Sequence, residues 1–171
     1  MTYAIVFSSR TGNTRKLAER ARAWLGEKDC AWFGGPSDLP DGALDGVDVV
    51  LLGSWTDKGG LDPELADVAA GLSGRRVFLF GTCGYGGDPA YYARVLGNFG
   101  AALAPGAEVV GSYLCQGQMP PAVRERYLLM AERDPERFAP LVENFDRAQG
   151  HPNEDDLVAL ESALARAGLA S

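Results

Sequence analysis

Apolar runs and helical stripes alternate along the first two thirds of the chain. Continuous apolar runs are typical of strands buried on both faces, and they occupy residues 3–7, 30–33, 47–53, 76–81 and 108–115. Between the runs, apolar residues recur at helical spacing, as at Leu17, Ala21, Trp24 and Leu25. Strands that alternate with helices in this way predict a doubly wound parallel sheet, of class α/β, over about residues 1–120.

The remaining residues, 121–171, have a different pattern. Helical spacing predicts three short helices there, one over about residues 123–130, one starting after Asp134 and one capped by Asn153. Each is too short to hold a core of its own. We therefore expect a single domain over residues 1–171, in which this C-terminal extension docks on the helices that cover the sheet.

Composition narrows the class of protein. The chain has 171 residues, 46% hydrophobic and 23% charged, with a formal net charge of −7. This amino-acid composition is typical of globular proteins, and the excess of acidic residues argues against a nucleic-acid partner. The three cysteines form no C-x-x-C pair, so neither a disulfide framework nor a metal site is indicated. Without a long apolar segment or a leader pattern, we expect a cytoplasmic protein with no membrane contact.

The turn after the first strand carries the strongest chemical signal. It leads directly into a helix, whose first N–H groups and positive dipole end attract anions. It is neither the G-x-G-x-x-G dinucleotide motif nor a Walker loop. So many neutral donors favour a terminal monophosphate over a simple helix cap. The residues of the turn are Ser8, Ser9, Arg10, Thr11, Gly12, Asn13 and Thr14.

Two later loops follow the third and fourth strands. Both start at carboxyl ends of central strands, where ligands of open α/β sheets bind. Each loop has one aromatic residue among small ones, Trp55 in residues 53–60 and Tyr85 in residues 81–88. These rings could cover a planar ligand, or they could be ordinary core or surface aromatics. Trp55 has few apolar neighbours in its loop, which favours the ligand.

The first strand and its turn, Ile5-Val6-Phe7 followed by Ser9-x-x-Gly12-x-Thr14, resemble the flavodoxins. That resemblance implies FMN as cofactor, a five-stranded sheet of order 2-1-3-4-5, and electron transfer to a redox partner protein. The implied cofactor site comprises the turn of residues 8–14 together with Ser54, Trp55, Thr56, Asp57, Gly59, Thr82, Cys83, Gly84, Tyr85 and Asp88. Thr56 departs from the family, which often has glycine after the tryptophan.

Further stretches are similar to the BilS-type flavodoxin-like proteins associated with bacterial bilirubin reductase. They are Trp-Thr-Asp-Lys-Gly at residues 55–59, Leu-Cys-Gln-Gly at residues 114–117 and His-Pro-Asn-Glu-Asp-Asp-Leu at residues 151–157. The resemblance implies a carrier that passes electrons to a partner reductase in bilirubin or other tetrapyrrole reduction. The expected oligomeric state is a monomer or a weak dimer.

Two alternatives stay open. The chain could be an FMN-dependent oxidoreductase that acts directly on a small molecule such as a quinone, or a phosphate-binding module without flavin. No catalytic residue is assigned, because acidic neighbours disfavour the Cys83 thiolate. Asp57, Asp62 and Asp88 predict an acidic rim around the ring, which would attract a basic patch on the partner.

Overall fold

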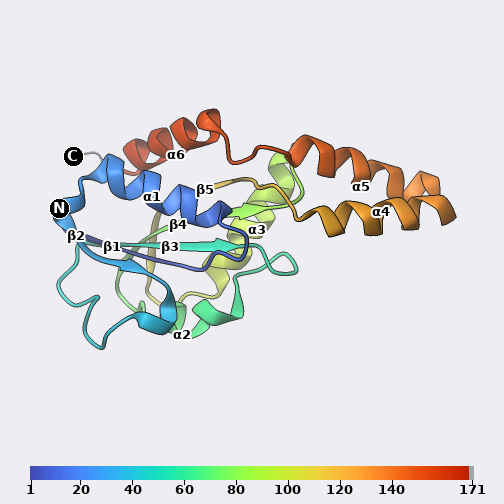
Figure 1. Cartoon of the computed structure of the whole chain (residues 1–171). Coiled ribbons are helices and arrows are strands. Elements are labelled where there is room, and N and C mark those ends of the chain that lie inside the picture. Colours follow the sequence, from blue (N-terminus) through green and yellow to red (C-terminus); the bar gives the residue numbers. More distant parts are fainter. Residues whose placement is uncertain (170–171) are drawn as a thin grey trace.

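The computed structural model describes residues 1–169, so the last two residues of the predicted extension lie outside it. Five parallel strands form one sheet with the order β2-β1-β3-β4-β5 (Figure 1). This confirms the predicted α/β class and strand order. The strands are β1 (Tyr3–Phe7), β2 (Cys30–Gly34), β3 (Val49–Trp55), β4 (Arg76–Cys83) and β5 (Glu108–Gln116).

Helices cover both faces of the sheet (Figure 1). On one face lie α1 (Asn13–Leu25) and α6 (Glu154–Arg166), and on the other lie α2 (Ala66–Ala70) and α3 (Pro89–Ala101). Short 3₁₀ turns span Glu27–Asp29, Pro36–Asp38 and Pro63–Leu65. The predicted caps are confirmed, because Asp62 accepts the Glu64 N–H, Asp88 the Ala90 N–H and Asn153 the Asp156 N–H.

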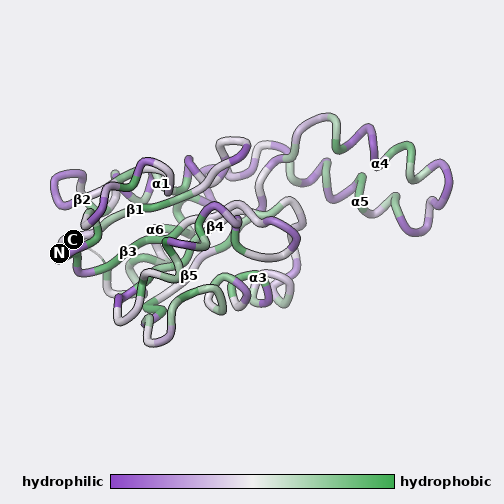
Figure 2. Tube along the Cα trace, turned by 90° about the horizontal axis from the view of Figure 1, so that it is seen from below, coloured by the Kyte–Doolittle hydropathy of each residue, from purple (hydrophilic) through white to green (hydrophobic). Residues whose placement is uncertain are grey.

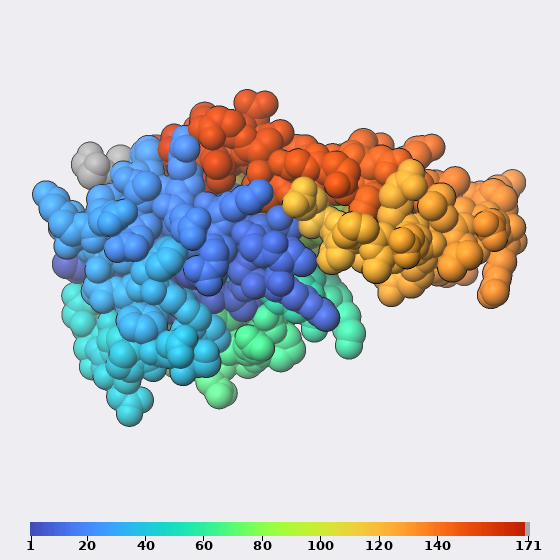
Figure 3. Space-filling view, viewed as in Figure 1, coloured from blue at the N-terminus to red at the C-terminus, as the bar shows by residue number. Residues whose placement is uncertain are grey.

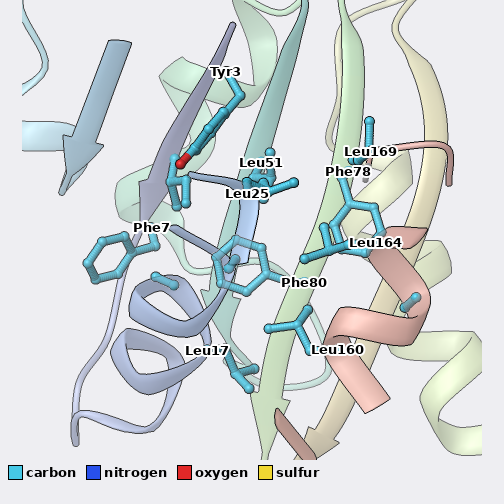
Figure 4. Close-up of a cluster of buried hydrophobic side chains, with 14 of the residues drawn as sticks. Tyr3, Phe7, Leu17, Leu25, Leu51, Phe78, Phe80, Leu160, Leu164 and Leu169 are labelled. Carbon is cyan, nitrogen blue, oxygen red and sulfur yellow. The ribbon is translucent and has the colours of Figure 1, made fainter. Parts of the chain in front are cut away.

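The core is divided by the sheet into two layers. Figure 4 shows the layer under α1 and α6, where fully buried side chains such as Phe80, Leu17 and Leu160 meet. The opposite layer joins the alternate residues of the strands to α2 and α3, as at Val6 and Phe99. Strands buried on both sides explain the continuous apolar runs of the sequence.

The central strands end later than predicted. β3 continues to Trp55 and β4 to Cys83, two residues beyond the expected ends in both cases. Ser54 pairs with Gly81 and Trp55 with Thr82, so residues assigned to loops by their polarity still belong to the ladder. The start of each loop is therefore held by the sheet rather than left free.

The prediction that all three C-terminal helices dock on the sheet's helices is wrong for two of them. Helices α4 (Pro121–Arg133) and α5 (Pro135–Ala148) pack on each other as a hairpin that projects from the body (Figures 1 and 3). Arg124 joins the two helices through an ion pair of 2.8 Å with Asp146. Apolar and polar positions alternate along both helices (Figure 2), and the two helices pack mainly on each other, which leaves Leu128 and Leu129 of α4 exposed.

Helix α6 docks as predicted, against α1 and β5. The α4–α5 hairpin is thus inserted between the last strand and the last covering helix, at the carboxyl edge of the sheet. Within residues 1–169, each helix is too short or too polar to pass through a bilayer.

Candidate functional site

Two neighbouring cavities open at the carboxyl edge of the sheet. The larger has a volume of about 730 Å³ and the smaller about 360 Å³, and Arg10 and Trp55 line both. The smaller cavity adds Ser8, Ser9, Asp62 and Glu64. The larger adds Thr11, Asn13, Thr56, Asp57, Lys58, Thr82, Cys83, Gly84, Gly117, Gln118, Met119, Pro120, Val123, Arg126 and Tyr127. The turn after β1 and the loops after β3 and β4 therefore converge as predicted.

The turn after β1 is built as a helix start with free donors. Gly12 caps α1 with φ 87°, a left-handed conformation that suits glycine, and Ser9 Oγ accepts the Arg15 N–H at 3.1 Å. Across residues 1–169, the backbone N–H groups of Asn13 and Thr14 find no acceptor. These donors are suited to an anion.

Ser8 provides an independent test of whether a phosphate fits. Its side chain is 6% exposed and lines the smaller cavity, yet its hydroxyl has no hydrogen-bond partner within the described residues. Buried hydroxyls are normally paired, because an unpaired one costs about 1–3 kcal/mol. A phosphate oxygen in the smaller cavity would supply the missing partner.

Asn13 and Thr14 have side-chain partners elsewhere in the protein. Asn13 Nδ2 donates to the Gln118 carbonyl at 2.8 Å, and the buried Thr14 hydroxyl lies 3.0 Å from the Thr82 hydroxyl. The Thr14–Thr82 pair joins the turn after β1 to the end of β4. The two side chains therefore join the turn after β1 to the segments at Gln118 and Thr82. The backbone N–H groups of Asn13 and Thr14 remain as the donors suited to an anion.

Trp55 stands at the boundary between the cavities. Its Nε1–H donates to Asp62 Oδ2 at 2.6 Å, while the Arg10 guanidinium lies 5.3 Å from the ring centroid. The Ser54 hydroxyl accepts the Asp62 N–H at 2.9 Å and is itself fully buried. Ser54 and Asp62 therefore fix the indole edge, and the ring is available to a planar ligand.

The rest of the loop after β3 is a tight turn. Asp57 and Gly60 exchange backbone hydrogen bonds of 3.0 and 2.8 Å around Lys58 and Gly59, whose φ values of 47° and 83° are those of a type I′ turn. Gly59 lies outside both cavity linings, and its carbonyl accepts from Asn98 at 2.8 Å. Its part in the predicted site is to form the turn.

Thr56 stands where many flavodoxins have glycine. Its N–H and its hydroxyl both donate to the Thr82 carbonyl, at 2.9 and 3.0 Å. The N–H of Thr56 is therefore committed to β4, and the peptide preceding Thr56 is held in place by the sheet.

The loop after β4 is only partly at the cavity. Thr82, Cys83 and Gly84 line the larger cavity, but Tyr85 does not. Tyr85 is 43% exposed, and its ring lies edge-on to Tyr91 of α3, with 5.2 Å between centroids. The structure thus does not bring Tyr85 to the wall, because this loop turns toward α3.

Asp88 and Cys83 are the other predicted site residues of the loop after β4 that have structural contacts. Asp88 lies outside both cavity linings and caps α3. Burial raises the pKa of the Cys83 thiol to about 12, and the thiol donates to the Tyr85 carbonyl at 3.0 Å. Cys83 is therefore a protonated wall residue at neutral pH.

The far wall of the larger cavity was not predicted from the sequence. It comes from residues 117–120 after β5 and from Val123, Arg126 and Tyr127 of α4. Behind it, Asn144 of α5 and Gln116 are buried polar residues. Asn144 follows Leu141 by three positions on the apolar stripe of α5, and a polar residue on that stripe was the available signal.

The charge at the larger cavity differs from the predicted acidic rim. Its lining carries Arg10, Lys58 and Arg126 against the single carboxylate of Asp57. The other carboxylates of the predicted rim have structural roles. Asp62, for example, accepts the Nε1–H at the edge of the indole. The mouth of this cavity is therefore basic, although the chain as a whole has a net charge of −7.

A five-stranded parallel sheet of this order, with unpaired N–H groups at the start of α1 among the described residues and a tryptophan at its carboxyl edge, defines a protein of the flavodoxin class. Residues 4–165 match the flavodoxin domain family, and the chain belongs to that family. It is accordingly an FMN-binding electron-transfer protein, of the kind that passes electrons to redox partners.

Individual relatives agree with this assignment. The chain is 37% identical to the flavodoxin-like domain-containing protein BilS of Clostridium symbiosum, over 96% of this chain and 94% of that protein. Identity to BilS of Clostridioides difficile is 29%, over 92% and 90%. Oxidised flavodoxin 1 from Bacillus cereus has a similar fold, with a TM-score of 0.55 and 17% identity over 98% of this chain and 97% of that one.

Proposed function

We propose that the two cavities together hold one FMN molecule, with its phosphate in the smaller and its ring in the larger. The carrying observation is that two cavities of unlike character meet at Arg10 and Trp55. The smaller is polar and contains the unpaired Ser8 hydroxyl with Arg10 and the carboxylates of Asp62 and Glu64. The larger adds apolar side chains, those of Met119, Val123 and Tyr127. A phosphate joined to a planar ring by a flexible polar chain has the matching distribution of groups.

The predicted site residues then divide into three roles. Ser8 and Ser9 of the smaller cavity would hold the phosphate, the N–H group of Asn13 would contribute from the side of the larger cavity, and Trp55 would cover one face of the ring. Thr82, Cys83 and Gly84 would border the ring. Ser54, Gly59 and Asp88 would act through the shape of their loops.

Bound FMN supplies reversible transfer of one or two electrons. The chain's contribution is to stack the ring, exclude water from one face and surround it with groups that do not react. Cys83 suits that surrounding, because its thiol remains protonated. Arg10, Lys58 and Arg126 place positive charge at the mouth, where it favours the anionic form of a reduced ring.

We further propose that the electrons pass to a partner reductase that acts on bilirubin or another tetrapyrrole. Support comes from the two relatives named BilS, which match over more than nine tenths of this chain. The basic mouth favours a partner with an acidic surface near its own acceptor site. Salt would then slow the association of the two proteins.

A visible absorption spectrum of the purified protein, before and after addition of FMN and removal of the excess, tests the cofactor. A retained flavin spectrum with quenched fluorescence supports the proposal. Loss of all flavin on the column would leave the smaller cavity as a site for another phosphate and would overturn the carrier function.

Direct reduction of a small molecule is the second candidate. It is favoured by the apolar side of the larger cavity, where Met119, Val123 and Tyr127 face the same space as Trp55. Such a wall could receive a quinone beside the ring. Reduced protein is mixed with a quinone in the absence of any partner. Fast flavin oxidation whose rate saturates with quinone concentration favours the enzyme, and slow oxidation whose rate rises linearly with quinone concentration favours the carrier.

A further inference from the structure

A buried amide on the projecting hairpin is bonded to the loop after β4. Asn144 of α5 is 3% exposed, and its Nδ2 donates to the Gly84 carbonyl at 2.9 Å. Its Oδ1 accepts the Gly86 N–H at 3.1 Å. Asn144 therefore holds two peptide groups of a loop that is sixty residues earlier in the chain and whose Gly84 lines the larger cavity.

Gln116, at the end of β5, completes the network. Its Nε2 donates to the same Gly84 carbonyl at 3.0 Å and to Asn144 Oδ1 at 3.0 Å. The Gly84 carbonyl thus accepts two N–H groups. A Cβ at position 86 would clash with the Gln116 carboxamide in its observed position, so glycine leaves room for that amide to approach.

These contacts are unusual for their place in the fold. Helix α4 buries no residue, and the hairpin lies beside the sheet rather than on it. Buried amides that satisfy their partners rigidify and specify the segments they join. The network accordingly holds α5 to the cavity, and it specifies the path of the Gly84–Gly86 loop.

We propose that Asn144 is a positioning residue for the flavin site, which acts by fixing the Gly84 peptide through hydrogen bonds from the hairpin. This inference rests on the proposed function of the cavities. With its carbonyl engaged by two amides, the Gly84 oxygen is held toward Asn144 and Gln116. Loss of Asn144 frees one bond to that oxygen and leaves the Gly86 N–H without its partner.

Loss of Asn144 should weaken the binding of the flavin ring and should leave the binding of the phosphate unchanged. Asn144→Ala is expected to raise the Kd for FMN and the Kd for riboflavin by the same factor, roughly tenfold, the size of one hydrogen bond's net contribution. The midpoint potential of bound FMN should shift as well. A tenfold change in the ratio of affinities for reduced and oxidised flavin corresponds to about 59 mV for one electron.

The experiment measures both Kd values by flavin fluorescence and the potential by spectroelectrochemistry, on the full chain. Glu143→Gln, at an exposed neighbour on the same helix, is the matched control and should change neither quantity. Gln116→Met removes the other donor to Gly84 at similar length. It should reproduce the effect, and it replaces Asn144→Ala if that variant does not fold.

The outcomes separate the two proposals. If the wild-type protein binds no flavin, the proposed function is overturned, and this inference with it. If the wild type binds FMN and the variants lose thermal stability but keep both Kd values within twofold and the same potential, Asn144 is only a structural residue. A rise in the Kd for FMN with none for riboflavin would also overturn the inference, because it would place the effect at the phosphate.

Discussion

The indole of Trp55 is bonded edge-on to Asp62, with Nε1 2.6 Å from Oδ2, and the same carboxylate caps the segment that follows. Asp62 in turn is held through its own N–H by the Ser54 hydroxyl. One buried carboxylate therefore sets both the angle of the ring and the start of the next helical turn. The orientation of the indole is therefore set by hydrogen bonds within the protein.

Replacing Trp55 tests the stacking. Trp55→Ala should raise the Kd for FMN about a hundredfold, because it removes the buried ring area and the stacking energy together. Trp55→Phe keeps a ring but loses the Nε1–H bond, so a smaller loss is expected. Both variants remove the bond to the buried Asp62, so both should lower the thermal midpoint of the apoprotein, and Trp55→Phe is the control for that shared loss. Unchanged FMN affinity in Trp55→Ala would remove the stacking role.

Ser8→Ala should have opposite effects on the apoprotein and on FMN binding. Without ligand, the variant loses a buried hydroxyl that has no partner in the described chain, so its free energy of unfolding should stay equal or rise by up to about 1 kcal/mol. FMN should bind roughly tenfold more weakly, and riboflavin should bind as before. Denaturant unfolding and flavin fluorescence give the two quantities. A matching loss for riboflavin would contradict a phosphate contact.

Asp62 allows its cap and its bond to the indole to be tested together. Asp62→Ala should lower the free energy of unfolding by about 1–3 kcal/mol, because it removes an N-cap and leaves the indole N–H unpaired. Asp62→Asn keeps one acceptor oxygen, so it can retain only one of the two bonds, and its cost should lie between zero and that of Asp62→Ala. Urea titrations of the wild-type and variant apoproteins measure the differences. Stability of both variants equal to that of the wild type would show that neither bond contributes.

Alkaline pH should destabilise the fold through Cys83. The native protein keeps the thiol proton to a pKa of about 12, whereas the unfolded chain loses it near 9.0. Between these values the unfolded state binds fewer protons, so stability falls as the pH rises from about 9. Cys83→Ala should show a shallower fall over pH 9–10 in urea titrations. Identical slopes in wild type and variant would show that Cys83 does not contribute.

The sheet and the turn after β1 were predictable because their signals are local. The apolar run of residues 3–7 and the helix start that follows it lie within about a dozen positions of each other. The cap at Asp88 can be recognised from its neighbour Pro89 alone. The ends of β3 and β4 were not, because Ser54 and Thr82 look like loop residues. Their strand conformation follows from partners on another strand, which the local sequence does not show.

The walls of the larger cavity were even harder to predict from the sequence. Tyr85 satisfies the composition expected of a ring-covering residue, but the course of its loop is set by Asn144, about sixty residues later in the chain. Helical spacing in α4 and α5 indicates a covered face without saying which element covers it. The helices cover each other, so Tyr127 reaches the cavity from a hairpin rather than from the sheet.

The hairpin also has a consequence for the order in which the molecule comes apart. Its helices pack mainly on each other, and α5 buries Phe145 and Ala148 whereas α4 buries no residue, so α4 has the least apolar surface opposing its separation from the body. Units of this kind open at a lower free energy than the global one, and their amide protons exchange sooner. We therefore expect the cavity wall that α4 contributes to open before the five strands separate, which would admit solvent to the larger cavity from that side.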